Sequence, residues 1–402
     1  AKEGKGVKEL LDFLAQFGLS LVDRPPEVAE EKGEEVKLEP KPDGPLAALV
    51  FKTITEAHVG EIYYVRVYSG TLKAGVEVYN SSSGETEKIN AIYKVIGNQR
   101  TETSELIPGQ IGALVKLKAT KTGDTLTEKG RELKIRWVQL PKPLHTIAIK
   151  PQTRNDEEKL SEAISRLHAE DPSFVYRYDP ELKQHLLAGY GDIHLDVIIA
   201  KMQEKFNVKI NKEKPKIPYR ETIRKKAEAM GRYVKQTGGR GQYGICYIRI
   251  EPLPRGQGYE WVDEIFGGAI PKEYRPAVEQ GVKKAMQAGV LAGYPVVDVK
   301  VTLYDGKYHE VDSSNMAFEI AGSLAFKEAQ SKADPYLLEP IYKVTVWVPD
   351  ENMGDVIGEI NARRGRIQGM EPEGRMQKIT ALVPLAELLD FTAALRAKTK
   401  GR

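Results

Sequence analysis

The spacing of apolar residues changes several times along the chain, and each change predicts a different kind of structure. Residues 1–22 carry apolar side chains at the spacing of one helix face, namely Val7, Leu10, Leu11, Leu14 and Phe17. A single amphipathic helix cannot bury its own apolar face, so we expect residues 1–22 to be the last helix of a domain that is otherwise missing. Residues 23–45 follow with five prolines and a run of glutamates, which predicts a linker.

Residues 46–130 change to short runs in which apolar and polar residues alternate. The predicted strands are Ala47–Lys52, Gly60–Tyr68, Val76–Tyr79, Glu87–Val95 and Gln110–Lys116. Turn pairs such as Ser69-Gly70 and Pro108-Gly109 separate them, and no helical spacing intervenes. Closely spaced short strands without helices predict a small β-barrel.

Two later segments share one order of elements. Residues 143–211 read as strand, helix, strand, strand, helix and strand, with helices over Asp156–Ala169 and Asp192–Phe206. This βαββαβ order predicts a ferredoxin-like fold. Residues 340–402 repeat the order as far as a second helix over Leu385–Ala397, and then the chain stops. We therefore expect a second ferredoxin-like unit without its last strand, and a chain that is truncated at both ends.

Residues 217–335 contain a hairpin with a glycine-rich tip. Strands are predicted over Met230–Val234 and Ile245–Glu251, and four of the seven residues from Gly238 to Gly244 are glycine. Glycine lets a backbone adopt positive φ angles and approach a partner surface closely. The rest of the segment predicts a helix, a strand, a loop and a helix; these are Pro271–Ala288, Val296–Tyr304, Asp305–Ser314 and a helix that runs on to about Ser331.

The chemistry of this hairpin tip suits contact with RNA. Six basic residues and one acid, Glu228, lie between Arg224 and Gly244, and Tyr243 offers a ring for base stacking. The alternative is a solvated turn, which is the commoner role of a glycine-rich tip. The tip does not fit a nucleotide-phosphate loop, because it leads from a strand into a strand and not into a helix.

Composition narrows the classes of function. The net charge is only +3, so affinity for nucleic acid must come from local patches. The single cysteine, Cys246, excludes an internal disulfide, and its position in an apolar strand predicts a small buried side chain. The six histidines show no metal-binding spacing, so we predict no metal site. No apolar run reaches membrane-spanning length and no signal peptide is recognised, so we expect a cytoplasmic protein without a membrane partner.

Several stretches are recognisable as motifs. They are Gly60–Gly75, Pro218–Thr222, Gln236–Gly244, Gly289–Pro295, Tyr308–Ser314 and Asn361–Gly365. Together and in this order, they resemble bacterial elongation factor G over essentially the whole chain. The stretch Gly189–Asp196 varies the family's usual Gly-Met-Gly-Glu-Leu-His-Leu-Glu with similar residues.

The resemblance implies a multidomain α+β fold. Residues 46–130 resemble the family's second domain, the translation-factor β-barrel, and residues 143–211 its ferredoxin-like third domain. Residues 217–335 resemble the fourth domain, an α/β fold like ribosomal protein S5. Residues 340–402 resemble the fifth domain, which is again ferredoxin-like but here lacks its last strand.

The resemblance also implies where the chain contacts RNA. In the family, two loops at the tip of the fourth domain reach the decoding site of the small ribosomal subunit, behind the moving transfer RNA and messenger RNA. The fifth domain docks near the factor-binding centre of the large subunit. The matching residues are Gln236, Thr237, Gly238, Gly239, Arg240, Gly241, Gln242, Tyr243, Tyr308, His309, Arg363, Arg364 and Arg366, with His309 at the apex of the second loop.

No GTPase motif is present in the sequence. The phosphate-binding pattern Gly-x-x-x-x-Gly-Lys-Ser/Thr is absent, and the family carries it in a first domain whose last helix residues 1–22 resemble. We therefore expect no catalytic residue and no cofactor in this chain, with GTP and Mg²⁺ bound by the missing domain. The full-length protein is expected to be a GTPase, and this chain a monomer.

The expected function is to promote translocation during elongation. Paralogues share the tip motifs, so ribosome recycling and ribosomal protection stay open as alternatives, although the glycine-rich tip counts against protection. Two other classes also stay open. One is an enzyme with a small-molecule site on the third or fourth domain, for which no nucleophile–base pair stands out. The other is a fragment that binds protein and not RNA, whose affinity would fall less steeply with salt.

Overall fold

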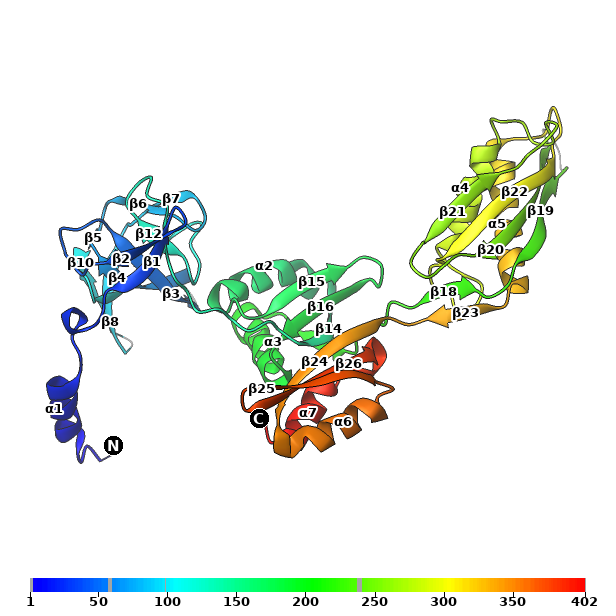
Figure 1. The fold of residues 1–402 in the computed structure, drawn as a ribbon. Coiled ribbons are helices and arrows are strands. Elements are labelled where there is room, and N and C mark those ends of the chain that lie inside the picture. Colours follow the sequence, from blue (N-terminus) through cyan, green and yellow to red (C-terminus); the bar gives the residue numbers. More distant parts are fainter. Residues whose placement is uncertain (1–2, 57–59, 98, 237–240, 402) are drawn as a thin grey trace. The chain divides into compact units, whose positions relative to one another are not determined.

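The chain divides into two compact units, Ala1–Pro215 and Lys216–Arg402, and each is described by itself (Figure 1). The computed structural model describes residues 3–56, 60–97, 99–236 and 241–401. Helices and sheets occur together in both units, so the multidomain α+β class is confirmed. In these ranges we find no helix with the length and apolar content needed to cross a membrane.

Helix α1 (Val7–Phe17) begins the first unit, and the short 3-10 helix η1 (Leu21–Asp23) follows it. The predicted apolar face is present on α1. Leu11 and Phe17 on this face are 59% and 63% exposed, so the helix does not bury them against the parts of the chain that the structure describes.

A β-hairpin lies in the segment for which the sequence predicted a linker. Strands β1 (Glu27–Glu31) and β2 (Glu34–Leu38) pair with each other, and β1 also pairs with β13 (Leu133–Ile135). Ala29 and Leu38 are buried in a small core that the hairpin shares with the barrel. Glutamate and lysine occupy most of the other positions, which hid the two strands in the sequence. The expected linker is therefore wrong for residues 27–38.

The barrel segment forms an eight-stranded antiparallel sheet with the order β7-β6-β12-β3-β4-β11-β8-β9, and two short strands, β5 and β10, pair beside it. Its strands are β3 (Ala47–Glu56), β4 (Gly60–Ser69), β5 (Leu72–Lys73), β6 (Glu77–Asn80), β7 (Glu85–Lys88), β8 (Ile92–Ile96), β9 (Gln99–Thr103), β10 (Glu105–Leu106), β11 (Ile111–Val115) and β12 (Thr125–Thr127). Inward residues such as Val50, Val65 and Leu114 share one core. The predicted strand Glu87–Val95 is divided between β7 and β8.

The ferredoxin-like order predicted for the third domain is confirmed. Its elements are β14 (His145–Pro151), α2 (Arg154–Glu170), β15 (Val175–Asp179), β16 (Gln184–Gly189), α3 (Asp192–Phe206) and β17 (Ile210–Glu213). The strands form an antiparallel sheet in the order β15-β16-β14-β17. Thr153 caps α2, since its hydroxyl accepts a hydrogen bond from the Asp156 amide at 3.2 Å and the Asp156 carboxylate accepts one from the Thr153 amide at 3.0 Å.

A buried carboxylate joins the barrel to the ferredoxin-like domain within the first unit. The Glu170 side chain, which is 5% exposed, accepts hydrogen bonds from the Thr55 amide at 2.7 Å and from Lys205 Nζ at 2.6 Å. Lys205 also donates to the Thr55 carbonyl at 3.1 Å. Burial raises the pKa of the Glu170 carboxyl, but the hydrogen bonds from Lys205 and Thr55 lower that pKa by more, so it lies below its ordinary value.

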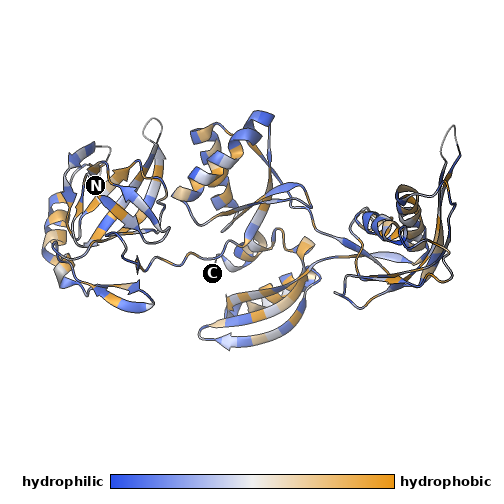
Figure 2. Cartoon of the chain, turned by 90° about the horizontal axis from the view of Figure 1, so that it is seen from above, coloured by the Kyte–Doolittle hydropathy of each residue, from blue (hydrophilic) through white to orange (hydrophobic). Residues whose placement is uncertain are grey.

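The fourth domain places two helices on one face of a four-stranded sheet (Figure 2). Its elements are β18 (Arg220–Ile223), β19 (Ala227–Lys235), β20 (Gln242–Pro252), β21 (Tyr259–Asp263), α4 (Arg275–Met286), β22 (Val299–Lys307), α5 (Asn315–Lys332) and β23 (Pro335–Leu338). The sheet order is β19-β20-β22-β21, and β18 pairs with β23 separately. The predicted hairpin is confirmed, whereas the parallel strand β21 was not predicted. Burial raises the pKa of the Cys246 thiol to about 12, as expected for a buried side chain.

Two glycines let the β19–β20 hairpin approach the backbone of α5. A Cβ at Gly231 would lie 1.8 Å from the carbonyl oxygen of Ala321, and a Cβ at Gly244 would lie 2.8 Å from the backbone of Ala317. Any larger residue would therefore push the helix away from the sheet. This close contact fixes the two strands of the hairpin on the domain core.

The fifth domain has the predicted βαββα order. Its elements are β24 (Ile341–Pro349), η2 (Asp350–Asn352), α6 (Met353–Ala362), β25 (Arg366–Glu373), β26 (Met376–Pro384), η3 (Leu385–Glu387) and α7 (Phe391–Thr399). The strand order β24-β26-β25 repeats the order β14-β16-β15 of the third domain. The predicted helix from Leu385 begins only at Phe391, because the short 3-10 helix η3 precedes it.

Candidate nucleic-acid interface

Two loops meet at one end of the fourth domain. The Tyr243 amide donates to the Asp312 carbonyl at 2.8 Å, and the Ser313 hydroxyl donates to the Tyr243 carbonyl at 2.9 Å. The start of β20 and the segment 308–314 are thus joined through their backbones. This is the pair of loops that the sequence predicted to act together. Of the predicted residues, Thr237, Gly238, Gly239 and Arg240 lie outside the described residues.

Gly241 lies beside the Asp312 side chain of the second loop. A Cβ at this position would lie 2.8 Å from the Asp312 carboxylate. The neighbouring predicted residues differ in exposure: Gln236 is exposed, and Gln242 is half-buried at the start of β20. A larger residue at Gly241 would therefore have to displace the Asp312 side chain, and Gln236 is the exposed side chain nearest to it in the described sequence.

His309 is held in place by its own loop. Its Nδ1 atom accepts hydrogen bonds from the amides of Val311 at 3.3 Å and Asp312 at 3.2 Å, while its own amide donates to the Ser313 hydroxyl at 2.9 Å. Because Nδ1 accepts, the neutral ring carries its proton on Nε2. The side chain is 53% exposed, so the loop presents a ring of fixed orientation to solvent.

Aromatic rings gather around His309. The rings of Tyr243 and His309 are 6.0 Å apart at an interplanar angle of 47°, and Tyr308, which precedes His309 in the chain, is 43% exposed. Rings of this kind can stack on unpaired bases. The structure therefore brings together Tyr243 and His309, two of the residues that the resemblance marked as RNA contacts.

Residues that the sequence analysis did not single out anchor the second loop. Ser314 caps α5, since its hydroxyl accepts a hydrogen bond from the Ala317 amide at 3.2 Å. The Tyr274 ring stacks on Phe318 at 5.2 Å, and its hydroxyl reaches the Ser313 carbonyl at 3.5 Å. The sequence signals for this anchoring were the stretch Tyr308–Ser314 as a whole and the helix predicted to start near Ser313 or Ser314.

The three predicted arginines of the fifth domain differ in their surroundings. Arg363 is 14% exposed and donates to Glu359 at 2.7 Å and to Asp390 at 2.5 Å. Arg364 donates through two nitrogens to Glu339, at 2.5 and 3.0 Å, and to Glu387 at 3.0 Å. These carboxylates hold the pKa of Arg364 above its ordinary value.

Arg366 differs because it is exposed and forms no ion pair within the described part of the chain. A phosphate that binds Arg363 or Arg364 would have to displace the carboxylates already bound to these side chains. At Arg366, within the described residues, no carboxylate would have to be displaced. RNA contact at these three positions stays a prediction, and Arg366 is the one whose charge is available.

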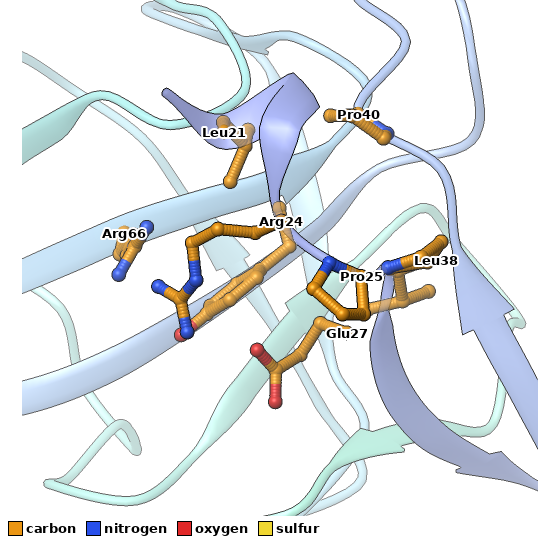
Figure 3. Close-up of a pocket in the computed structure, with 9 residues that line it drawn as sticks. Leu21, Arg24, Pro25, Glu27, Leu38, Pro40 and Arg66 are labelled. Carbon is orange, nitrogen blue, oxygen red and sulfur yellow. The ribbon is translucent and has the colours of Figure 1, made fainter. Parts of the chain in front are cut away.

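A small pocket lies beside η1 in the first unit (Figure 3). It is lined by Leu21, Arg24 and Pro25 before the hairpin, by residues of β1 and β2, and by Arg66 on β4, whose guanidinium lies 5.2 Å from the Tyr68 ring centre. Its volume of about 10 Å³ holds about one water molecule. The pocket is therefore too small for a substrate.

A larger hollow of about 500 Å³ lies between the barrel and α2. Tyr63, Lys118, Lys121 and His168 are among its lining residues. Burial and the charge of Lys121 lower the pKa of His168, and the Tyr63 hydroxyl donates to Glu61. Among the described residues, His168 makes no hydrogen bond to a nucleophile, so this hollow offers no assembled nucleophile–base pair.

Four family models match consecutive parts of the chain. Elongation factor G domain 2 matches residues 45–129, and Elongation Factor G, domain III matches residues 140–214. Elongation factor G, domain IV matches residues 215–334, and the Elongation factor G C-terminus matches residues 336–402. The two joined loops lie in the part that matches domain IV.

A crystal structure of a protein from Thermus thermophilus is similar over nearly the whole chain. The match has 39% sequence identity and a TM-score of 0.78, and it covers 98% of this chain and 57% of that chain. The chain therefore spans little more than half the length of that relative.

Proposed function

Because the chain belongs to the elongation factor G family, we propose that it is the ribosome-contacting body of a translational GTPase that moves transfer RNA and messenger RNA during elongation. Interaction with the ribosome in general follows from these domains. The proposal assigns GTP hydrolysis, with GTP and Mg²⁺, to the first domain of the whole protein, which would act as a cytoplasmic monomer.

The joined loops of the fourth domain carry this proposal. Tyr243 and His309 present their rings from backbones that are hydrogen-bonded to each other and anchored on α5. A preorganised surface loses little conformational entropy on binding, so its contacts add more fully to affinity. The proposed target of these loops is the decoding site of the small subunit.

The fifth domain supplies the second proposed contact. Arg366 is exposed at the start of β25, and its charge is free to meet phosphate at the factor-binding centre of the large subunit. Arg363 and Arg364 instead hold the turn between α6 and β25 through their carboxylate partners.

Co-sedimentation with 70S ribosomes tests the proposed function. The chain is expected to bind at low salt and to dissociate as salt rises, because RNA contact releases counterions. Tyr243→Ala and His309→Ala are each expected to weaken binding about tenfold, the loss of one stacked base. Tyr342→Ala removes a half-exposed ring from the fifth domain and is expected to have no effect.

If all three variants bind ribosomes equally well, the two loops do not contact the ribosome as proposed. In the whole protein with its GTPase domain, the Tyr243→Ala and His309→Ala variants are each expected to slow single-round translocation. Splitting of ribosomal subunits without movement of the messenger RNA would instead assign the chain to a recycling paralogue.

A further inference from the structure

The four-stranded sheet of the fourth domain has one open face. Helices α4 and α5 cover only the opposite face (Figure 2). Cys246 and Ile248 of β20 lie in the core beneath these helices, so strand alternation turns Tyr243, Ile245 and Tyr247 toward the open face. Tyr243 belongs to the candidate interface, and the open face therefore continues it along β20.

A β-bulge decides which residues of β22 share the open face. Leu303 is buried in the core, and uninterrupted alternation would turn Lys307 inward as well. The register of β20 against β22 skips one residue, Tyr304, at this point. Gly306 consequently faces the core, where a Cβ would lie 2.4 Å from Ile270, and Lys307 faces outward.

The cations at the end of the open face away from the loops are neutralised. Each has a carboxylate partner on a neighbouring strand. The pairs are Arg249 with Glu228 at 3.0 Å, Lys226 with Glu251 at 3.7 Å and Lys300 with Glu260 at 3.6 Å. This end of the face therefore offers little net charge to a partner.

Two cations next to the loops have no ion-pair partner among the described residues. Arg232 on β19 and Lys307 on β22 flank Ile245 of β20 in the register. Both side chains are exposed, and neither forms an ion pair within the described ranges. Their Cα atoms are about 10 Å apart, since neighbouring strands are separated by about 4.8 Å. The acid nearest to them in the register, Asp305, is opposite Tyr247, and its carboxylate accepts a hydrogen bond from the Gly306 amide at 2.8 Å.

Tyrosine rings lie on both sides of this pair of cations. Tyr243 and Tyr247 are four residues apart on β20, which corresponds to about 13 Å along the strand. Tyr243 is 6.0 Å from the His309 ring, and Tyr247 is 6.3 Å from the Tyr304 ring. From the joined loops onward, the open face therefore presents an aromatic ring, then a pair of positive charges, and then a second aromatic ring.

We propose that this surface, which we call the β20 face and define by Arg232, Tyr243, Tyr247 and Lys307, binds an unpaired RNA strand. The phosphates lie toward Arg232 and Lys307, and the bases lie against the two tyrosines. The proposal rests on the proposed function, which brings RNA to the adjoining loops. Free positive charge concentrated beside those loops, where the rest of the face is neutralised, favours a polyanion over a protein partner.

Binding of a fluorescein-labelled oligouridine of about twelve nucleotides to the whole chain tests the β20 face. In the double variant Arg232→Ala/Lys307→Ala, the slope of log affinity against log salt is expected to fall by about 1.4, because two phosphate contacts each contribute about 0.7. Tyr247→Leu is expected to weaken binding about tenfold with an unchanged slope, and Tyr247→Phe to restore most of the affinity.

The matched control is Lys327→Ala on α5. Lys327 is exposed, unpaired within the described ranges and on the helical layer beneath the sheet, so its removal is expected to leave the slope unchanged. The proposal is overturned if the chain does not bind oligouridine, or if the double variant behaves as Lys327→Ala does. Ribosome co-sedimentation of the same proteins keeps the two proposals separate, because failure of the unaltered chain to bind ribosomes contradicts only the proposed function.

Discussion

At the scale of residues, Glu221 shows how one buried carboxylate organises a loop. Its side chain is fully buried and accepts hydrogen bonds from three backbone amides of the loop 289–295 at 2.7–3.1 Å, and from Gln330 at 2.8 Å. The stretches 218–222 and 289–295, which are separate motifs in the sequence, are therefore two parts of one structural element. Both stretches thus take part in holding the fold of the fourth domain.

Glu221→Gln is expected to destabilise this loop by about 2–3 kcal/mol. The –NH2 group of the glutamine side chain cannot accept a hydrogen bond, so it leaves backbone amides of the loop without an acceptor. Hydrogen exchange of the amides in residues 289–297 measures the effect. Since about 1.4 kcal/mol corresponds to a factor of ten, these amides are expected to exchange about 30- to 150-fold faster.

Glu273→Gln is the control for this change. Glu273 is exposed in the same domain and forms no ion pair in the described ranges, so the isosteric substitution is expected to leave exchange unchanged. Equal exchange rates in both variants would show that the Glu221 carboxylate does not hold the loop.

At the scale of elements, the β19–β20 hairpin depends on close contact with α5. Gly231 faces the Ala321 carbonyl oxygen, and no side chain fits between them. The hydrophobic pattern predicted both elements but not this contact. Tyr243 lies near the start of β20, and α5 is capped by Ser314 at the end of the second loop, so the packing of the two elements positions Tyr243 beside that loop.

Gly231→Ala is expected to lower the free energy of unfolding of the second unit by about 1–3 kcal/mol, because the added methyl group forces α5 away from the sheet. Thermal unfolding followed by circular dichroism checks this. The same substitution at Gly358 in α6, where a Cβ would contact nothing, is expected to be neutral or to stabilise by up to about 1 kcal/mol. A Gly231→Ala protein as stable as the Gly358→Ala protein would contradict the packing argument.

At the scale of the whole molecule, the contacts of Glu170 couple two domains of the first unit. The carboxylate and Lys205 together bind both the amide and the carbonyl of Thr55 on β3. A change in the charge of Glu170 therefore acts on the junction between the barrel and the ferredoxin-like domain.

Glu170→Gln is expected to destabilise the first unit by about 1–3 kcal/mol at neutral pH, since it leaves Lys205 without its buried partner. The folded pKa of Glu170 lies below the ordinary value of 4.5, so its contribution is complete above pH 4.5 and is lost as the pH falls through the folded value. Urea unfolding between neutral and acidic pH is expected to show the gap between the two proteins closing.

Glu204→Gln, at an exposed and unpaired position on α3 in the described ranges, is the control for Glu170. It is expected to follow the unaltered chain at every pH. A gap between Glu170→Gln and the unaltered chain that stays constant as the pH falls would assign the effect to packing and not to the charge.

The sequence by itself determined the order and type of most elements. The helix over Asp192–Phe206 has the predicted bounds, and both ferredoxin-like orders are confirmed, because helix periodicity and turn residues are encoded within short stretches. The motifs likewise identified the family. The roles of the residues at the predicted interface, in contrast, remain predictions.

Only the tertiary structure decided which side chains are available to a partner. Alternation alone would bury Lys307, but a bulge against β20 turns it outward. A pair of adjacent arginines resembles a phosphate clamp in the sequence, but Arg364 is bound by Glu339 and Glu387. The physical reason is that registers and ion pairs join residues that are far apart in the chain, so the local pattern fixes what a segment is and the fold fixes what its side chains meet.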